Sequence, residues 1–183
     1  MNTTHDLCQA LAKQLRQRGF MLSTAESCTG GLIVAACTDL AGSSDWFERG
    51  FVTYSNHAKT EQLSVPADLI RVHGAVSEPV VRCMAQGALS HARAQVAVAV
   101  TGIAGPTGGS AEKPVGTVWL GWALPEGQVV SECQHFEGDR AEVRAATVRY
   151  ALQRLLTLLQ TTAWRVTEKP FQSAFGAFSD RHR

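Results

Sequence analysis

The sequence predicts an α/β protein, a single three-layer-like domain in which a mixed sheet is flanked by helices. Segments with helical spacing of apolar residues alternate with short apolar runs typical of strands. Two strand-like runs near the end, at 117–123 and 129–136, are separated only by a short turn, which indicates a hairpin within the sheet. The 183 residues, 45% of them apolar, are enough for one domain with a substantial core.

The first half of the chain is predicted to contain helices interrupted by two strands. Leu7, Leu11 and Leu15 lie one helical turn apart, which predicts an amphipathic helix over 4–18. Ser77 has the character of an N-cap, and Pro79 suits the first turn of the helix that follows, which ends near Ser90. The remaining elements are strands at 21–25 and 47–54, a buried helix at 32–37, and weaker helices at 56–63 and 66–73.

The second half is predicted to hold the central strand and the longest helix. Alternating Val and Ala at 95–101 are typical of a buried strand, and a glycine-bearing loop follows at 102–116. Asp139 and Glu142 have the spacing of a capping box. The helix after them has a buried face made of residues at helical spacing, namely Val148, Leu152, Leu155 and Leu159. Periodicity ends near residue 160, so we predict a domain over 1–160 and a peripheral or poorly ordered tail over 161–183.

Composition narrows the classes of function. Lys plus Arg number 17 and Asp plus Glu 16, so the net charge of +1 gives no general attraction to nucleic acids or anionic membranes. Arg140, Arg144 and Arg149 are candidates for a local basic patch. There is no apolar run of about 18 residues and no secretory signal at the start. We therefore expect a cytoplasmic protein without a membrane or nucleic-acid partner.

Cysteine and histidine usage argues against metal chemistry. The five cysteines are scattered and never form a C-x-x-C pair, which disfavours a disulfide framework and a cysteine zinc site. The six histidines are isolated, so we predict no catalytic metal and no Ser-His-Asp triad. We expect no cofactor. Only His57 lies close to another candidate residue.

The first segment that suggests chemistry contains Ser27, at a predicted strand-to-helix turn. A nucleophile there is exposed at the end of the sheet, and the N–H groups near Gly30 and Gly31 can approach an oxyanion. Thr29, Gly30 and Gly31 are therefore expected to contact the substrate. This is the logic of a nucleophile elbow, although the G-x-S-x-G pattern is absent. Two alternatives stay open: Ser27 or Thr29 merely caps the helix, or Cys28 is the nucleophile, since a thiolate is activated at a helix N-terminus.

The second segment contains Tyr54 and Lys59, just after a predicted strand. A lysine can act as the base for a serine when burial or a nearby cation lowers its pKa. Tyr54 suits a proton relay or a support for the lysine. The alternative is a packed tyrosine and a solvated helix lysine.

The third segment is the loop that begins with Thr101 and Gly102. Its glycines, which include Gly105 and Gly108, follow a central strand at the edge where α/β proteins bind ligands, so they suggest a phosphate or ribose cradle. The loop matches neither a Walker A motif nor a G-x-G-x-x-G fingerprint. Arg140, at the start of the last helix, has the geometry to pair with a phosphate. A turn-rich surface loop and an exposed arginine are the alternatives.

At these segments the sequence resembles the C-terminal domain family of the competence/damage-inducible protein CinA, and within it the stand-alone nicotinamide-nucleotide amidohydrolases (NMN deamidases). The resemblance covers roughly residues 5–160. It is carried by five motifs in the family's order: AESCTGG at 25–31, GSSDWFERGFVTYSNHAK at 42–59, GAVSEP at 74–79, TGIAGPTGGSAEKPVGTV at 101–118 and FEGDR at 136–140.

The resemblance implies hydrolysis of the carboxamide of nicotinamide mononucleotide (NMN) to nicotinate mononucleotide and ammonia, in pyridine-nucleotide recycling. It also implies a Ser-Lys mechanism with Ser27 as nucleophile, Lys59 as general base and Tyr54 in the same site. The Thr101–Gly109 loop and Arg140 match segments that line the family's site. A homo-oligomer is expected from the family and the aromatic tail. The alternative function is a nucleotide-sensing or partner-binding module without turnover; a role in DNA binding is the weakest candidate.

Overall fold

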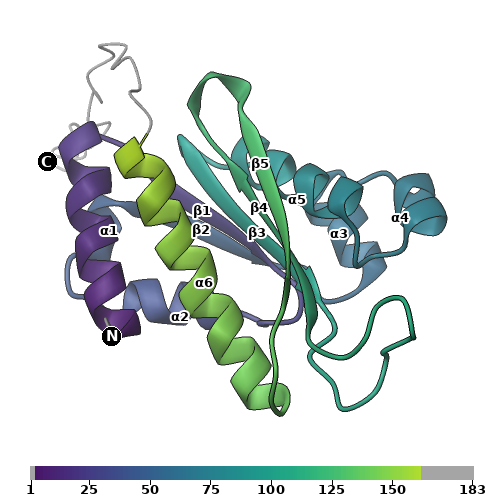
Figure 1. The fold of residues 1–183 in the computed structure, drawn as a ribbon. Helices are drawn as coiled ribbons and strands as arrows, with labels where there is room; N and C mark the ends of the chain where they lie inside the picture. The colour runs from purple at the N-terminus through teal and green to yellow at the C-terminus, as the bar shows by residue number, and fades with distance from the viewer. Residues whose placement is uncertain (1–2, 162–183) are drawn as a thin grey trace, which may run out of the picture.

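The protein is described by a computed structural model that covers residues 3–161, with a five-stranded mixed sheet at its centre (Figure 1). The strand order is β2-β1-β3-β4-β5. β1 is parallel to β2 and β3, whereas β4 is antiparallel to β3 and β5. The predicted mixed sheet and terminal hairpin are therefore confirmed. The strands are β1 (Leu22–Glu26), β2 (Phe47–Val52), β3 (Val96–Gly102), β4 (Thr117–Ala123) and β5 (Val129–His135).

Six α-helices in the described residues cover the two faces of the sheet and complete the predicted three layers. Figure 1 shows α1, α2 and α6 on one side, and α3, α4 and α5 on the other. The first group is α1 (Thr4–Arg18), α2 (Leu32–Thr38) and α6 (Arg140–Thr161). The second is α3 (Asn56–Leu63), α4 (Ala67–His73) and α5 (Glu78–Ser90). Two short 3₁₀ turns lie at Ser43–Asp45 and Pro125–Gly127.

The central strand β3 explains why the two faces differ. Its side chains alternate, so Val96, Val98 and Val100 join the core beneath α1 and α6, while Ala97 and Ala99 join the core beneath α5. Small alanine side chains let α5 pack closely against the sheet. The alternation of Val and Ala that predicted a central strand thus also sets its two packing surfaces.

Several helix ends follow the predicted local rules. The Asp139 carboxylate accepts from the N–H of Glu142 at 2.9 Å, and the Glu142 carboxylate accepts from the N–H of Asp139 at 2.7 Å, which confirms the capping box. Ser77 occupies the N-cap position of α5, but its hydroxyl donates to the Gly74 carbonyl instead of capping the helix. The N-cap position was predicted correctly, but not the bond of its side chain.

Two other expectations concern the C-terminal tail and membrane-spanning helices. From residue 162 on, the predicted tail lies outside the described residues. Among the residues that are described, no helix is both long and apolar enough to cross a membrane.

Candidate active site

Three predicted segments meet at one edge of the sheet because β1, β2 and β3 are parallel. Glu26, the last residue of β1, pairs with Val52 of β2 and with Val100 of β3. Ser27, which follows β1, therefore lies between Thr53, which follows β2, and Thr101 near the end of β3. β2 ends at Val52, two residues before the predicted strand end, and this releases the chain to turn into α3.

Ser27 and Lys59 contact each other directly in this edge region. The Lys59 amine donates to the Ser27 hydroxyl at 3.0 Å and to the Thr53 carbonyl at 2.8 Å. Lys59 is only 1% exposed and Ser27 only 8%. Ser55 caps α3 by accepting from the N–H of Ala58, which starts the helix so that Lys59 faces inward. A solvated lysine, the alternative from the sequence, is therefore wrong.

Burial also changes the basicity of this lysine. Desolvation lowers the pKa of Lys59 from 10.5 to about 8. An amine with such a pKa is neutral in a substantial fraction of molecules near pH 8. A neutral amine has a lone pair that can accept the proton of a serine hydroxyl.

Cys28 is buried beside this pair, but its chemistry differs from that of an activated thiolate. Burial is the main cause that raises the pKa of the Cys28 thiol to about 11, and the nearby Glu26 raises it further. The thiol is therefore protonated at neutral pH, whereas thiolate nucleophiles have lowered pKa values. This weighs against Cys28 as the nucleophile.

The turn between Ser27 and α2 is organised by Glu26, which the sequence analysis missed. Gly30 and Gly31 adopt left-handed conformations with φ of 60° and 98°, which allow the chain to reverse tightly. The Glu26 carboxylate accepts from the Thr29 hydroxyl and from the N–H groups of Gly31, Ile33 and Val34. Neither Ser27 nor Thr29 caps the helix. An acidic residue within a few positions of a predicted helix start was the signal for this role.

The same bonds change the expectation for the oxyanion donors. The N–H of Gly31 donates to Glu26 at 3.0 Å, and that of Gly30 donates to the Ser27 carbonyl at 3.1 Å. Both groups named from the sequence are thus engaged within the turn. Over residues 3–161, the N–H groups of Cys28 and Thr29 donate to no backbone carbonyl.

A small cavity of about 240 Å³ opens beside the Ser27–Lys59 pair and adjoins a larger one of about 630 Å³. Ala104 and Arg140 line both. Besides these two, the small cavity is lined by Ser27, Cys28, Tyr54, Asn56, Lys59, Ala75, Val76, Thr101 and Gly102. The large cavity is further lined by Pro106, Val115, Gly138, Asp139, Ala141 and Arg144.

Arg140 bridges the walls of the small cavity. One guanidinium nitrogen donates to the Gly105 carbonyl and the other to the Tyr54 hydroxyl, both at 2.8 Å. Tyr54 is 61% exposed, so it is not the packed tyrosine of the alternative interpretation. The Thr101 hydroxyl donates to the Ala75 carbonyl at 2.9 Å, which ties β3 to the opposite wall.

The remaining candidates separate into those near the cavities and those away from them. Gly108 lies in the exposed part of its loop and lines neither cavity. His57 lies on the outer side of α3, in a separate hollow. Arg144, predicted only as part of a basic patch, lines the large cavity and donates to the Thr29 carbonyl at 2.9 Å. Its spacing of four residues from Arg140 was the signal for a shared helix face.

Metal ligands do not gather at this site. Within residues 3–161, no three His, Cys, Asp or Glu side chains are grouped so that they could hold a metal ion.

Comparisons with known proteins agree with the arrangement of the motifs. The profile of the family described as CinA C-terminal domain matches residues 4–159. A nicotinamide-nucleotide amidohydrolase PncC from Enterobacter agglomerans is 55% identical over 152 residues, which cover 83% of this chain and 93% of that protein. The protein of the same name from Escherichia coli K12 is 54% identical over 149 residues, 81% of this chain and 90% of that protein.

A solved structure gives the same result for the fold. The competence/damage inducible protein CihA from Agrobacterium tumefaciens superposes with a TM-score of 0.82 at 47% sequence identity. The match covers 86% of this chain and 99% of that one. Sequence, fold and relatives thus agree, and this chain belongs to the CinA C-terminal domain family.

Proposed function

We propose that this protein is an amidohydrolase that converts NMN and water into nicotinate mononucleotide and ammonia. The observation that carries the proposal is the buried Ser27–Lys59 pair, 3.0 Å apart, at the wall of a cavity. The names of relatives that are 54–55% identical support the choice of substrate. In keeping with that substrate, we assign the protein to pyridine-nucleotide recycling in the cytoplasm.

In the proposed mechanism, Lys59 first acts as a general base. Its neutral amine takes the proton of Ser27, whose oxygen attacks the carboxamide carbon to form a tetrahedral intermediate. The C–N bond breaks, the leaving nitrogen takes the proton from Lys59, and ammonia departs. Lys59 then deprotonates a water molecule that attacks the carbonyl carbon of the Ser27 ester. The ester C–O bond breaks, the Ser27 oxygen takes the proton back from Lys59, and nicotinate mononucleotide departs with the new carboxyl group.

The negative oxygen of the tetrahedral intermediate needs hydrogen-bond donors. The N–H groups of Cys28 and Thr29 belong to the same turn as Ser27 and have no carbonyl partner in residues 3–161. We assign the oxyanion role to them in place of Gly30 and Gly31, whose N–H groups are engaged. One such donor contributes about 3–4 kcal/mol in well-studied enzymes.

The two adjoining cavities suit the two halves of NMN. A cavity of about 240 Å³ beside Ser27 suits a single carboxamide-bearing ring. The cavity of about 630 Å³ is lined by Arg140 and Arg144, and arginine is complementary to the phosphate of a nucleotide. The proposal thus assigns the ring to the small cavity and the phosphate to the large one.

The test is to incubate the purified protein with NMN, in the presence of a metal chelator, and to measure ammonia and nicotinate mononucleotide together. Nicotinamide riboside, which lacks the phosphate, is the matched substrate control, and Ser27→Ala is the matched protein control. We expect both products from NMN with the wild type, a much higher KM for the riboside, and no turnover by the variant.

The alternative function, a nucleotide-sensing module, predicts a different result. NMN would bind, with an affinity measurable by calorimetry, yet no ammonia would appear under any of these conditions. That outcome would contradict the proposed hydrolysis.

A further inference from the structure

Glu26 is a fully buried carboxylate immediately before the proposed nucleophile. It is 0% exposed and is the last residue of β1. The carboxylate accepts four hydrogen bonds: one from the Thr29 hydroxyl at 2.6 Å, and three from the N–H groups of Gly31, Ile33 and Val34 at 3.0, 3.0 and 2.9 Å. Four donors converge on the two oxygens of one side chain, so this is a firmly held group.

These four bonds determine the shape of the turn that carries Ser27. The N-cap residue of α2 is Gly31, which has no side chain to cap the helix. Glu26 takes that role from the preceding strand, and its bonds span from Thr29 to the first turn of α2. The backbone between β1 and α2 is therefore anchored at both ends, with Ser27 as its first residue.

A second contact, from α6, holds the same turn. The Thr29 carbonyl accepts from the Arg144 guanidinium of α6 at 2.9 Å, while the Thr29 hydroxyl donates to Glu26. Thr29 itself is 0% exposed. Its side chain thus supports the turn, and Thr29, which the sequence suggested as a substrate contact, lines neither cavity.

We infer that Glu26 is a positioning residue for the nucleophile. Its carboxylate holds the turn so that the Ser27 hydroxyl lies within hydrogen-bond distance of the Lys59 amine. It also accepts from the N–H groups of Gly31, Ile33 and Val34 at the start of α2, which fixes the path of the backbone that follows Ser27. The inference rests on the proposed hydrolysis for its kinetic test, but its geometric test needs no substrate.

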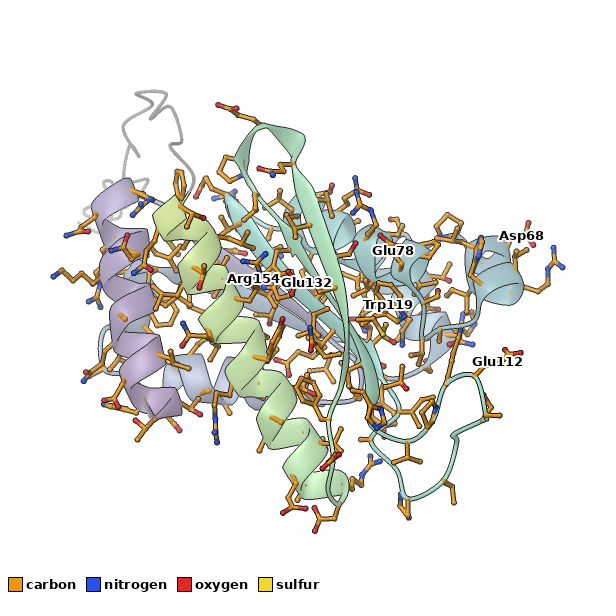
Figure 2. The ribbon with its side chains drawn as sticks, viewed as in Figure 1. Asp68, Glu78, Glu112, Trp119, Glu132 and Arg154 are labelled. Carbon is orange, nitrogen blue, oxygen red and sulfur yellow. The ribbon has the colours of Figure 1, made fainter. Side chains whose placement is uncertain are left out.

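The sharpest variant is Glu26→Gln, which keeps the size of the side chain. Its amide nitrogen is a donor that faces other donors, so about half of the accepting capacity is lost. The matched control is Glu132→Gln on β5. Glu132 is also a carboxylate held by its neighbours, since it accepts from the Tyr150 hydroxyl and from Arg154, both at 2.7 Å. Figure 2 shows Glu132 and Arg154 labelled next to each other, where β5 passes α6.

We expect kcat of Glu26→Gln to fall at least tenfold per folded molecule while KM for NMN changes less than about twofold. A shift of the reacting groups by about 1 Å is sufficient for a loss of roughly a hundredfold. The pH midpoint of the residual activity should stay that of the wild type, because Lys59 remains the base. Glu132→Gln should lose stability without loss of kcat. A Glu26→Gln enzyme with kcat within twofold of wild type, or with its loss confined to KM, would overturn the inference.

A milder pair of variants covers the case in which Glu26→Gln does not fold. Thr29→Val removes one donor to Glu26, and Thr147→Val is its control, since Thr147 is also fully buried and donates only to the Val143 carbonyl of its own helix. We expect a threefold to tenfold lower kcat with unchanged KM for the first variant alone. Equal kcat values for the two variants would count against the inference.

The geometric test is a crystal structure of Glu26→Gln, or of Thr29→Val, beside that of the wild type. We expect the Ser27 oxygen to lie beyond hydrogen-bond distance from the Lys59 nitrogen in the variant. An unchanged distance would overturn the positioning role. If the wild type released no ammonia, the proposed function would fail, while these structures would still decide the role of Glu26.

Discussion

The amine of Lys59 lies 3.0 Å from the hydroxyl of Ser27, although 32 positions separate the two residues in the chain. Ser27 follows β1 and Lys59 lies in α3, which follows the neighbouring parallel strand β2. The pair therefore exists because two parallel strands end at the same edge of the sheet. Its chemistry depends on burial, which makes a neutral amine accessible near pH 8.

The rate of NMN hydrolysis should rise with pH. The base must be neutral, and the pKa of Lys59 is lowered to about 8, so kcat/KM should increase about tenfold per pH unit below that value and level off above it. The measurement is kcat/KM from pH 6 to 9.5. Lys59→Arg, which stays protonated, should be inactive across this range. A flat profile, or one that falls with pH, would rule out a lysine base.

Replacing Lys59 with methionine should stabilise the protein at neutral pH. The folded-state pKa of Lys59 is about 8 and its unfolded value is 10.5. Above pH 10.5 the amine is neutral in both states, so its burial does not reduce the free energy of unfolding. As pH falls from 10.5 to 8, the unfolded state gains a proton that the folded state does not, so the loss of stability grows. Below pH 8 the loss is constant. A difference of this size corresponds to at most about 3 kcal/mol, from which the lost hydrogen bonds of the amine must be subtracted.

We therefore expect the free energy of unfolding of Lys59→Met at pH 7 to exceed that of the wild type by about 1–2 kcal/mol. The advantage should shrink as pH approaches 10.5. Denaturant melts at pH 7, 8.5 and 10 measure it, and Lys13→Met, at an exposed position of α1, is the control. If the difference in free energy of unfolding between Lys59→Met and wild type grew with rising pH, the lowered pKa of Lys59 would be contradicted.

Cys28→Ala should keep most of the activity. The thiol lines the small cavity but is protonated at neutral pH, since its pKa is raised to about 11. We expect kcat of Cys28→Ala to lie within about threefold of wild type. In the wild type treated with iodoacetamide at pH 8, peptide mass spectrometry should show Cys28 unmodified and activity should be retained. If Cys28→Ala were as inactive as Ser27→Ala, the nucleophile would have to be reassigned.

Tyr54 and Arg140 should act as one unit. The Arg140 guanidinium donates to the Tyr54 hydroxyl at 2.8 Å across the small cavity, so removal of either partner disrupts the same wall. In a double-mutant cycle with Tyr54→Phe and Arg140→Met, the double variant should lose about as much kcat/KM as Arg140→Met alone. Strictly additive losses would indicate two independent roles.

Local patterns in the sequence were sufficient for most of the fold. The spacing of Leu7, Leu11 and Leu15 and the alternation of Val and Ala in β3 are local properties, and both predicted their elements correctly. The strand order was not predicted, because it depends on contacts between distant segments. The end of β2 was placed two residues late for a related reason: Thr53 and Tyr54 are compatible with a strand, but the chain there must turn into α3.

The sequence motifs named residues that line the candidate site, but not the packing and hydrogen bonds that hold these residues in place. Ser27, Lys59 and Arg140 were all named from motifs, and they line one cavity. The burial of Lys59 was not evident, since most lysines are exposed and only packing decides otherwise. Glu26 was missed because the spacing suggested that Ser27 or Thr29 caps the helix, whereas a longer carboxylate from the strand reaches the same N–H groups.

The central claim is that Ser27 becomes acylated when NMN loses ammonia. The most direct measurement is acid quench of the enzyme during turnover, followed by peptide mass spectrometry. Our account predicts an adduct with the mass of NMN minus ammonia on Ser27, in the wild type and in Cys28→Ala, and no ammonia release by Ser27→Ala. An adduct on Cys28, or turnover by Ser27→Ala near the wild-type rate, would contradict it.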